Sequence, residues 1–392
     1  MPQALLIQSI KLENFLSYGA ASQPIELGAL NLIIGPNGTG KSNLLEALEL
    51  LRNAPDQFLK PISEGGGISD WLWKGGTEKP VASLEAIISY PAGPQNLRYQ
   101  IAFTETQQRF ELTDERIDRA DAGSTETNQA DTCYHFNQGR PTLSVNGTKR
   151  VLQREDIDPD RSILAQRKDP EQYPEITYLG KMLPKISLYR EWHFGRQTLY
   201  RTPQKADLPN DFLAADGKNL GLVLNRLQRD LPVKKRLLKA LNALYSGIVD
   251  YHVQIEGGTV QVFLQEEHGS IPASRLSDGT LRYLCLLAIL CHPNPPAVIC
   301  IEEPELGLHP DVLPTLADLL KEASQHTQLI VTTHSDVLVD AMTNMPEVVL
   351  VAEKGADGTT LTRLDPEQLK PWLEKYRLGA LWTRGEIGGT RW

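Results

Sequence analysis

Apolar side chains follow two different spacings near the start of the chain. Residues 30–34 are almost continuously apolar, which predicts a buried strand, and apolar residues then recur at helical spacing over 44–51. Between these two patterns lies the glycine-rich stretch GPNGTGKS, residues 35–42. The sequence therefore predicts a strand, a tight loop and a helix in immediate succession.

An earlier strand is predicted at Leu5–Phe15, where IQSIKLENF alternates apolar and polar residues before a turn around Tyr18 and Gly19. We expect this strand to pair beside the strand at 30–34. Phe15 and Tyr18 are candidates to flank an adenine ring. Aromatic residues that end an early strand are more often part of the core, so core packing is the favoured interpretation.

Short alternating segments after residue 80 predict an antiparallel β layer beside a parallel core. The predicted strands are VASLEAIISY (81–90), LRYQIAFTE (97–105) and RFELTDERI (109–117), followed by one or two hairpins in 132–148. The region 114–174 is otherwise polar, and DRADAGSTETNQAD (118–131) carries no apolar stripe, so we expect a peripheral arm there. Heptads are absent from it, which disfavours a long coiled coil.

The second half of the chain mixes helical and strand patterns. Amphipathic helices are predicted at 216–228 and 231–245, and a hairpin is predicted over 249–267. The helix that follows Ser277 is apolar on all sides and must therefore be buried. The remaining predicted elements are buried strands at 297–301 and 329–332, a helix at 336–342 and a strand at 348–352.

Composition limits the class of protein. The chain of 392 residues is 41% apolar, enough for a sizeable core, and its formal net charge of −9 excludes a surface that is uniformly polycationic toward DNA. The four cysteines lack metal-ligand spacing, as expected for core thiols of a reducing cytoplasm. No basic leader precedes an apolar run, and no run approaches the ~20 apolar residues of a membrane span. We therefore expect a cytoplasmic globular protein without a membrane partner.

The stretch 35–42 has the composition of a phosphate-binding loop. Gly35, Gly38 and Gly40 permit backbone angles that turn successive N–H groups toward an anion, and the following helix adds the positive end of its dipole. Lys41 supplies a charge for the β and γ phosphates, and the Ser42 hydroxyl is placed to ligate Mg²⁺. A glycine-rich turn without function is disfavoured, because every fixed position of the pattern is present between a strand and a helix. The sequence therefore predicts binding of ATP and Mg²⁺.

Further candidate chemistry lies between residues 275 and 334. Ser277 is a good helix N-cap, and the helix N-terminus after it is a second anion site. Glu302 and Glu303 follow a buried strand, at the edge where open α/β sheets bind ligands. One carboxylate suits a hydrated Mg²⁺ and the other suits the orientation of an attacking water. The strand at 329–332 delivers His334 to the same edge, where its ring can touch the γ-phosphate.

A basic and aromatic segment, ISLYREWHFGRQTLYRTPQ (186–204), has two interpretations. Interleaved basic and aromatic side chains can stack bases and hold phosphates, which makes nucleic acid a candidate partner. The same mixture also builds ordinary sheet edges and intrachain salt bridges, and this second interpretation is favoured.

Taken in order, GPNGTGKS, LSDGT, the strand ending IEEPELGLHP, and TTHSD resemble the Walker A, signature, Walker B with D-loop, and switch-histidine motifs of ABC-type ATPase heads. EEPELGLHP is similar to the RecF/SMC/OLD-like branch, and DGKNLGLVLNRL with the closing YRLGALW and GEIGGTRW is similar to its stand-alone bacterial predicted AAA family ATPases. The resemblance spans nearly the whole chain. It implies an α/β P-loop NTPase of ABC-ATPase type, with a mostly parallel core sheet flanked by helices, an antiparallel β subdomain and a helical or peripheral insertion.

The resemblance also implies site residues and domains. The implied nucleotide-binding residues are Gly35, Pro36, Asn37, Gly38, Thr39, Gly40, Lys41 and Ser42, with Ser277 and Gly279 reaching the γ-phosphate bound to a partner subunit. The implied catalytic residues are Glu303, His334 and Lys41, and the implied Mg²⁺ ligands are Ser42 and Glu302. The implied domains are an ATPase lobe at 1–113 with the antiparallel layer, a polar arm and helical insertion at 114–270, and a second ATPase lobe at 271–392.

Three positions depart from the family pattern. The usual second signature glycine is Asp278, the Walker B aspartate is Glu302, and the D-loop aspartate is His309. Gln107 and Gln108 are candidates for the Mg²⁺-coordinating Q-loop glutamine by their order alone. The departures imply slow hydrolysis and atypical communication between subunits.

Three functional classes stay open. The leading one is an ATPase whose homodimer closes on two shared ATP molecules and acts as a switch in DNA maintenance, DNA repair or antiviral defence. We find no acidic cluster at a strand end in the last sixty or so residues, so its effector, for example a nuclease, is expected to be separately encoded. A nucleotide-gated scaffold with little turnover is the alternative, and a transporter ATPase subunit is disfavoured by the LSDGT signature and the missing Q-loop.

Overall fold

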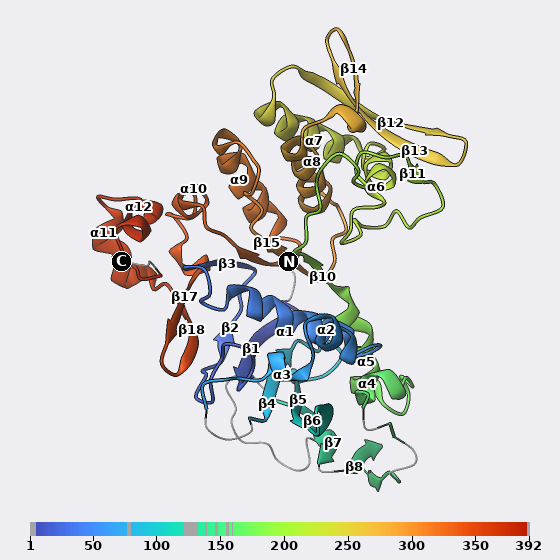
Figure 1. The fold of residues 1–392 in the computed structure, drawn as a ribbon, viewed down its shortest axis with the longest axis vertical. Helices are drawn as coiled ribbons and strands as arrows, with labels where there is room; N and C mark the ends of the chain where they lie inside the picture. The colour runs from blue at the N-terminus through green and yellow to red at the C-terminus, as the bar shows by residue number, and fades with distance from the viewer. Residues whose placement is uncertain are drawn as a thin grey trace. The chain divides into compact units, whose positions relative to one another are not determined.

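The computed structural model describes residues 5–76, 80–120, 132–137, 139–145, 148–153, 157–158 and 160–389 (Figure 1). Backbone contacts divide the chain into two compact units. The phosphate-loop unit comprises the described residues of 4–186, 347–364 and 385–392, and the carboxylate unit comprises 187–346 and 365–384. Residues 121–131 of the expected arm and 390–392 of the closing motif lie outside the described residues. Neither unit is continuous in sequence.

An eight-stranded antiparallel sheet runs through the phosphate-loop unit in the order β2-β1-β4-β5-β6-β7-β8-β9. Its strands are β1 (Ile7–Glu13), β2 (Ile25–Glu26), β4 (Ala82–Ile88), β5 (Leu97–Thr106), β6 (Arg109–Arg119), β7 (Thr132–Asn137), β8 (Arg140–Val145) and β9 (Thr148–Val151). The predicted antiparallel layer and hairpins are therefore confirmed, and they form one sheet.

The strand before the phosphate loop belongs to a different sheet. β3 (Leu30–Ile34) pairs in parallel with β17 (Val349–Gly355), which pairs antiparallel with β18 (Gly358–Arg363). The expectation that the first strand pairs beside β3 is wrong, because β1 pairs with β2 and β4. Burial explains the difference: β3 is buried at every position, as in a parallel core, whereas β1 mixes buried and half-buried positions, as in an antiparallel sheet with one covered face.

Short helices pack the phosphate-loop unit around an aromatic core. They are α1 (Lys41–Asn53), α2 (Leu59–Glu64), α3 (Ile68–Trp71), α4 (Ile163–Gln166), α5 (Pro174–Met182) and the 3-10 helix η3 (Leu183–Lys185). Phe15 meets Trp71 and Phe103 edge-on, at ring-centroid distances of 5.7 and 6.4 Å. Phe15 and Tyr18 are both buried, so the interpretation of these two aromatic residues as core is confirmed.

The carboxylate unit is built on a parallel pair of buried strands. β15 (Val298–Glu302) pairs in parallel with β16 (Gln328–Thr332), and β10 (Ile186–Tyr189) borders β15 on its other side. α8 (Asp278–Leu290) precedes β15, and α9 (Leu313–Ala323) joins it to β16. Every residue of α8 from 281 to 290 is buried, as its all-round apolar sequence predicts.

A smaller antiparallel sheet and further helices complete the carboxylate unit. The sheet contains β11 (Gln204–Lys205), β12 (Ile248–Glu256), β13 (Thr259–Glu266) and β14 (Gly269–Pro272). The α-helices are α6 (Leu220–Leu227), α7 (Leu231–Leu244), α10 (Asp336–Asp340), α11 (Pro366–Leu373) and α12 (Leu378–Thr383). The 3-10 helices are η4 (Ala273–Arg275) and η5 (Pro310–Val312), and a further one, η6 (Pro346–Val348), leads into β17. The predicted hairpin and amphipathic helices are confirmed, while β14 is an additional strand. The longest helix in the described part of the chain, α7, has 14 residues, so no long coiled coil is present there.

Candidate nucleotide site

The phosphate loop joins β3 to α1 and closely approaches the β17–β18 hairpin. A Cβ on Gly35 would lie 2.4 Å from the carbonyl oxygen of Ala352, and a Cβ on Gly40 would lie 2.5 Å from Oγ1 of Thr359. Both glycines also have positive φ angles, 146° and 93°. Because a side chain at either position would collide with its neighbour, these glycines are required by packing as well as by backbone conformation.

Lys41 is the first residue of α1, and its side chain turns back into the loop. It is buried, and its Nζ donates to the carbonyl oxygens of Gly35 and Pro36 at 2.8 and 3.0 Å. Asn37 and Gly38 at the tip of the loop are exposed. The loop thus holds a buried ammonium group beneath an exposed tip, which is the charge arrangement that cradles a phosphate.

The β17–β18 hairpin and the turn after β1 support the phosphate loop and the start of α1 with hydrogen bonds. The Thr359 hydroxyl donates to the carbonyl oxygen of Thr39 at 2.8 Å, and the Tyr18 hydroxyl donates to the carbonyl oxygen of Gly40 at 3.2 Å. Asn43, in the first turn of α1, donates to the Ser17 hydroxyl at 2.7 Å. Sequence reasoning missed these braces, because Thr359 lies 320 residues after the loop residue that it supports.

The carboxyl ends of β15 and β16 bring three of the predicted site residues together. Glu302 ends β15 and lies opposite Thr332, the last residue of β16. Beyond these ends, Nε2 of His334 lies 3.3 Å from Oε1 of Glu303. The expectation that parallel strands deliver these side chains to one edge is met within the carboxylate unit, where the His334 imidazole contacts the Glu303 carboxylate directly.

Glu303 has an unusual backbone that its neighbours hold in place. Its φ angle is 45°, in the left-handed region that non-glycine residues rarely occupy. The Glu303 N–H donates to the carbonyl oxygen of Thr332 at 3.0 Å. The Glu303 carbonyl oxygen accepts a hydrogen bond from Nη2 of Arg282 on α8 at 2.6 Å. Arg282 also stacks over the Trp192 ring, 4.9 Å from the centroid, and burial lowers the pKa of its guanidinium. A strained residue fixed from both sides is typical of a functional position.

Two further contacts that sequence reasoning missed involve the same strand ends. Nε of Arg190 lies 3.1 Å from Oε2 of Glu302, and each of these side chains is 19% exposed. Glu305 accepts hydrogen bonds from the Thr333 hydroxyl at 2.7 Å and from the His334 N–H at 2.6 Å. Glu302 therefore has a cationic partner, and Glu305 positions the segment that carries His334.

The signature segment shows the predicted cap and one packing constraint. The Ser277 hydroxyl accepts a hydrogen bond from the Thr280 N–H at 3.1 Å, which confirms Ser277 as the N-cap of α8. A Cβ on Gly279 would lie 2.4 Å from the carbonyl oxygen of Gly307. Gly279 is thus needed for the close approach of α8 to the loop after β15, whatever its role toward a nucleotide. His309, in the same loop, caps η5 by accepting a hydrogen bond from the Asp311 N–H.

Two of the three arginines of segment 186–204, and several of its aromatic residues, take part in intrachain contacts. Arg190 pairs with Glu302, and Arg201 pairs with Asp278. Tyr189 and Tyr200 are buried. These contacts are intrachain salt bridges and packing of the kind that the sequence interpretation favoured, and nucleic-acid binding by this segment stays a prediction.

The two candidate Q-loop residues occupy a hairpin turn. Gln107 and Gln108 connect β5 to β6, are both exposed, and have positive φ angles of 53° and 63°. Their proposed Mg²⁺ role stays a prediction.

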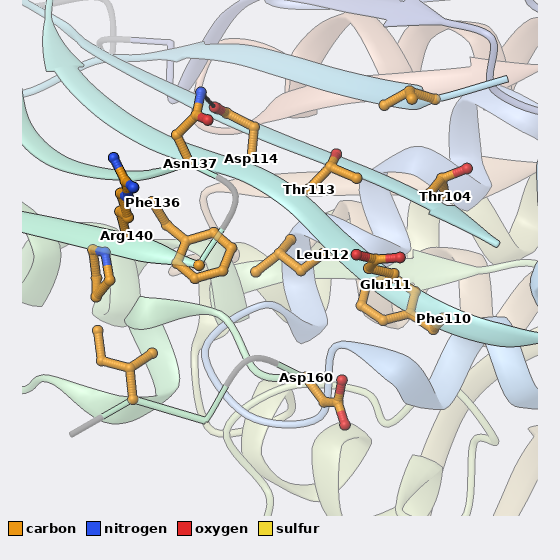
Figure 2. A pocket seen from close by; sticks show the side chains of 14 residues that line it. Thr104, Phe110, Glu111, Leu112, Thr113, Asp114, Phe136, Asn137, Arg140 and Asp160 are labelled. Carbon is orange, nitrogen blue, oxygen red and sulfur yellow. Dashed lines mark hydrogen bonds between the residues drawn. The ribbon is translucent and has the colours of Figure 1, made fainter. Parts of the chain in front are cut away.

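A separate pocket of about 1060 Å³ lies on the antiparallel sheet of the phosphate-loop unit (Figure 2). Figure 2 shows apolar side chains such as Leu112 and Phe136 beside the polar pair Asn137 and Asp114, whose amide and carboxylate are 3.2 Å apart. Its lining includes no residue of the phosphate loop. It is therefore distinct from the candidate nucleotide site.

The donor atoms of the two predicted Mg²⁺ ligands, taken one at a time, are of the type that Mg²⁺ binds. Ser42 offers a hydroxyl in the phosphate-loop unit and Glu302 offers a carboxylate in the carboxylate unit, and each is the kind of oxygen ligand that Mg²⁺ prefers. Within the described ranges no group of three or more His, Cys, Asp or Glu side chains is placed to hold a metal ion by itself.

None of the helices in the described part of the chain has both the length and the apolar composition that a membrane span requires.

Comparisons with known proteins give the family and the fold of the chain. The sequence model of the family described as "AAA domain, putative AbiEii toxin, Type IV TA system" matches residues 30–340. No curated protein matches the chain. Among solved structures, the chain is similar to an SMC head bound to the C-terminal winged-helix domain of ScpA, with a TM-score of 0.60, 16% identity, and coverage of 93% of this chain and 99% of that chain.

Two further structures have the same architecture. One is an Smc head with an extended coiled coil bound to the C-terminal domain of ScpA derived from Pyrococcus furiosus (TM-score 0.58, 15% identity, 94% and 99% covered). The other is an Smc head with a coiled coil and joint derived from Pyrococcus yayanosii (TM-score 0.50, 13% identity, 94% and 99% covered). The chain therefore has the fold of an ABC-type P-loop ATPase head and belongs to the AAA domain family described as putative AbiEii toxin.

Proposed function

We propose that this protein binds and hydrolyses ATP, and that two copies close around two ATP molecules to form a switch. The observation that carries the proposal is the pairing of His334 with Glu303 at the carboxyl ends of β15 and β16. The buried Lys41 within an exposed glycine loop supports it from the other unit. One set of residues suits phosphate binding, and the other suits activation of water.

Each residue has a definite role in this proposal. Lys41 neutralises charge on the β and γ phosphates, while Ser42 and Glu302 would hold Mg²⁺, which would supply further charge neutralisation. Glu303 accepts a hydrogen bond from the attacking water, and His334 orients Glu303 and senses the γ-phosphate. Arg282 fixes the backbone from which the Glu303 side chain extends. These assignments predict that binding and turnover can be separated by mutation.

The test compares Lys41→Ala with Glu303→Gln. Lys41→Ala should abolish ATP binding, whereas Glu303→Gln should bind ATP and release almost no phosphate. Binding is measured with a fluorescent ATP analogue, and turnover by steady-state phosphate release. Lys235→Ala, which removes an exposed lysine of α7, is the matched control and should retain both properties. Equal loss of binding in both site variants would remove the assignment of Glu303.

We further propose that a complete site needs two chains related by a two-fold axis, with Ser277 and Gly279 of one chain facing the ATP of the other. Ser277 caps α8, and the first N–H groups of such a helix point out of its N-terminus, where they can bind an anion. Glu303→Gln with ATP and Mg²⁺ should double in mass by light scattering, and Ser277→Arg should prevent this. Hydrolysis by a monomer at a specific rate independent of protein concentration would contradict the dimer.

We propose, on analogy of fold, that the switch belongs to the RecF/SMC/OLD-like branch and controls a separately encoded effector, for example a nuclease, in DNA maintenance, DNA repair or antiviral defence. The Smc heads with the same fold are bound to a separate protein, ScpA, according to their descriptions. In the described part of the last sixty residues, Asp357 lies in a turn and Asp365 caps α11. Purified protein with ATP and Mg²⁺ or Mn²⁺ should therefore leave plasmid and single-stranded DNA intact. Cleavage that persists in Lys41→Ala would place the effector in this chain.

A nucleotide-gated scaffold with little turnover is the second candidate. It is favoured by the Arg190–Glu302 ion pair, because a paired carboxylate is less available to a metal ion. If the scaffold proposal holds, the Glu303→Gln protein will show the same biological activity in the native host as the parent protein does. Loss of that activity in Glu303→Gln would favour the hydrolysing switch.

A further inference from the structure

The segment between β10 and β11, residues 190–203, contacts three motifs of the carboxylate unit. Arg190, at the start of the segment, forms an ion pair with Glu302 at an Nε–Oε2 distance of 3.1 Å. Trp192 stacks on Arg282, the residue that donates a hydrogen bond to the Glu303 carbonyl. Arg201 near its end reaches the residues that precede α8. Of Arg190, Trp192 and Arg201, Arg201 makes the most extensive contacts.

The Arg201 guanidinium uses all three of its nitrogen atoms. Nε donates to the carbonyl oxygen of Gly195 at 2.9 Å, and Nη1 donates to the carbonyl oxygens of Ser274, at 3.3 Å, and Leu276. Nη2 donates to Oδ1 of Asp278 at 2.5 Å. The Arg201 side chain is 13% exposed, whereas the Asp278 side chain is 52% exposed. A planar fork of donors can join three carbonyl oxygens and a carboxylate in this way, but an ammonium group cannot reproduce the geometry.

Asp278 brings a negative charge to a place where the proposed function needs an anion to bind. It is the first residue of α8, between Ser277 and Gly279, and ABC-type signatures usually have glycine there. A carboxylate at a helix N-terminus stabilises the helix itself, but it would repel a phosphate that approaches the same N–H groups. The exposed half of Asp278 faces solvent, so the repulsion would act on an incoming nucleotide.

We propose that Arg201 is a positioning residue for the ATP-dependent dimer: it cancels the charge of Asp278 and fixes the turn 274–278, so that the N-terminus of α8 can accept the γ-phosphate held by a second copy of this chain. The inference rests on the proposed dimer around ATP. Arg201 and Asp278 then act as one unit that replaces the usual signature glycine. Arg201 is needed because Asp278 is present.

A double-mutant cycle tests this dependence. All variants carry Glu303→Gln so that ATP persists, and dimerisation with ATP and Mg²⁺ is followed by analytical ultracentrifugation. Arg201→Ala should weaken the dimer about tenfold, equivalent to about 1.4 kcal/mol. The same change made together with Asp278→Gly should weaken it less than about threefold relative to Asp278→Gly alone. Arg201→Lys, which keeps the charge and loses the fork, should lie closer to the parent than Arg201→Ala.

A matched control and a second readout separate the outcomes. Arg226→Ala breaks the 2.6 Å ion pair with Asp211 elsewhere in the same unit and should leave dimerisation unchanged. Binding of a fluorescent ATP analogue by the isolated chain, which depends on Lys41, should be the same in every variant. A tenfold loss that persists in the Asp278→Gly background, or equal behaviour of Arg201→Ala and Arg226→Ala, would overturn the inference while leaving the dimer intact. A parent that binds ATP and stays monomeric would overturn the proposed dimer, and this inference with it.

Discussion

Glu115 on β6 has a fully buried carboxylate in the phosphate-loop unit. It accepts hydrogen bonds from the Tyr99 hydroxyl at 2.9 Å, the Ser162 hydroxyl at 2.5 Å and the Ile163 N–H at 2.9 Å. Burial raises the pKa of this carboxyl from 4.5 to about 7, although the three donors act in the opposite direction. Loss of hydration is therefore the dominant effect on the charged form.

The raised pKa predicts how stability changes with pH. Between pH 4.5 and about 7, folded Glu115 holds a proton that the unfolded chain has released, so the free energy of unfolding falls as pH rises through this window. A difference of about 2.5 pKa units corresponds to about 3 kcal/mol of stability, which is fully present below pH 4.5 and is lost once the pH rises above about 7. Glu115→Gln removes the titration with little change of shape. The parent should therefore lose about 3 kcal/mol relative to this variant between pH 4.5 and 8.

The assay is urea unfolding at fixed ionic strength, with fluorescence detection and the same protocol for parent and variant at each pH. Glu111→Gln, an exposed position on the same strand, is the control and should follow the pH dependence of the parent. The reasoning fails if the stability difference between the parent and Glu115→Gln is constant with pH. It also fails if the parent gains stability on that variant as pH rises, because the three donors would then outweigh the loss of hydration.

Three further predictions concern the candidate site. Glu305→Gln should lower kcat for ATP hydrolysis about tenfold without changing ATP affinity, because it weakens two charge-assisted hydrogen bonds that position the segment of His334; an unchanged kcat would argue against this role. Gly279→Ala should cost about 1–3 kcal/mol by overpacking, seen as a lower Tm, whereas Gly269→Ala, with open space around its Cβ, should not. Thr359→Val should raise the Kd for ATP about fivefold by removing a hydrogen bond worth about 1 kcal/mol to the phosphate loop, and equal affinities would contradict that support.

The sequence was sufficient for features that depend on neighbouring residues. The phosphate loop, the Ser277 cap and the buried α8 follow from local composition and periodicity, and the ends of β15 and β16 follow from the rule that parallel strands present their carboxyl ends at one edge. The domain divisions at 113 and 270 and the nucleotide contacts of individual residues stay predictions.

Features that depend on distant residues were not available from the sequence. Periodicity identified β1 as a strand but does not encode its partner, so its pairing with β4 was missed. The arginines of segment 186–204 could be identified in the sequence, but Arg190 pairs with Glu302, which lies 112 residues later in the chain. A cation directly after one strand and a carboxylate at the end of another are compatible with too many pairings for composition to select one.

The pairing of β3 with β17 has a consequence during synthesis of the protein. Leu32 pairs with Val349, so the strand that leads into the phosphate loop leaves the ribosome more than 300 residues before this neighbour. At roughly 5–20 residues per second, the wait is about 15 to 60 s. The threonine that braces the loop, Thr359, arrives later still. A prematurely terminated chain would therefore contain every residue of the phosphate loop and lack the hairpin that holds it, so truncated products should be poor competitors for ATP in the cell.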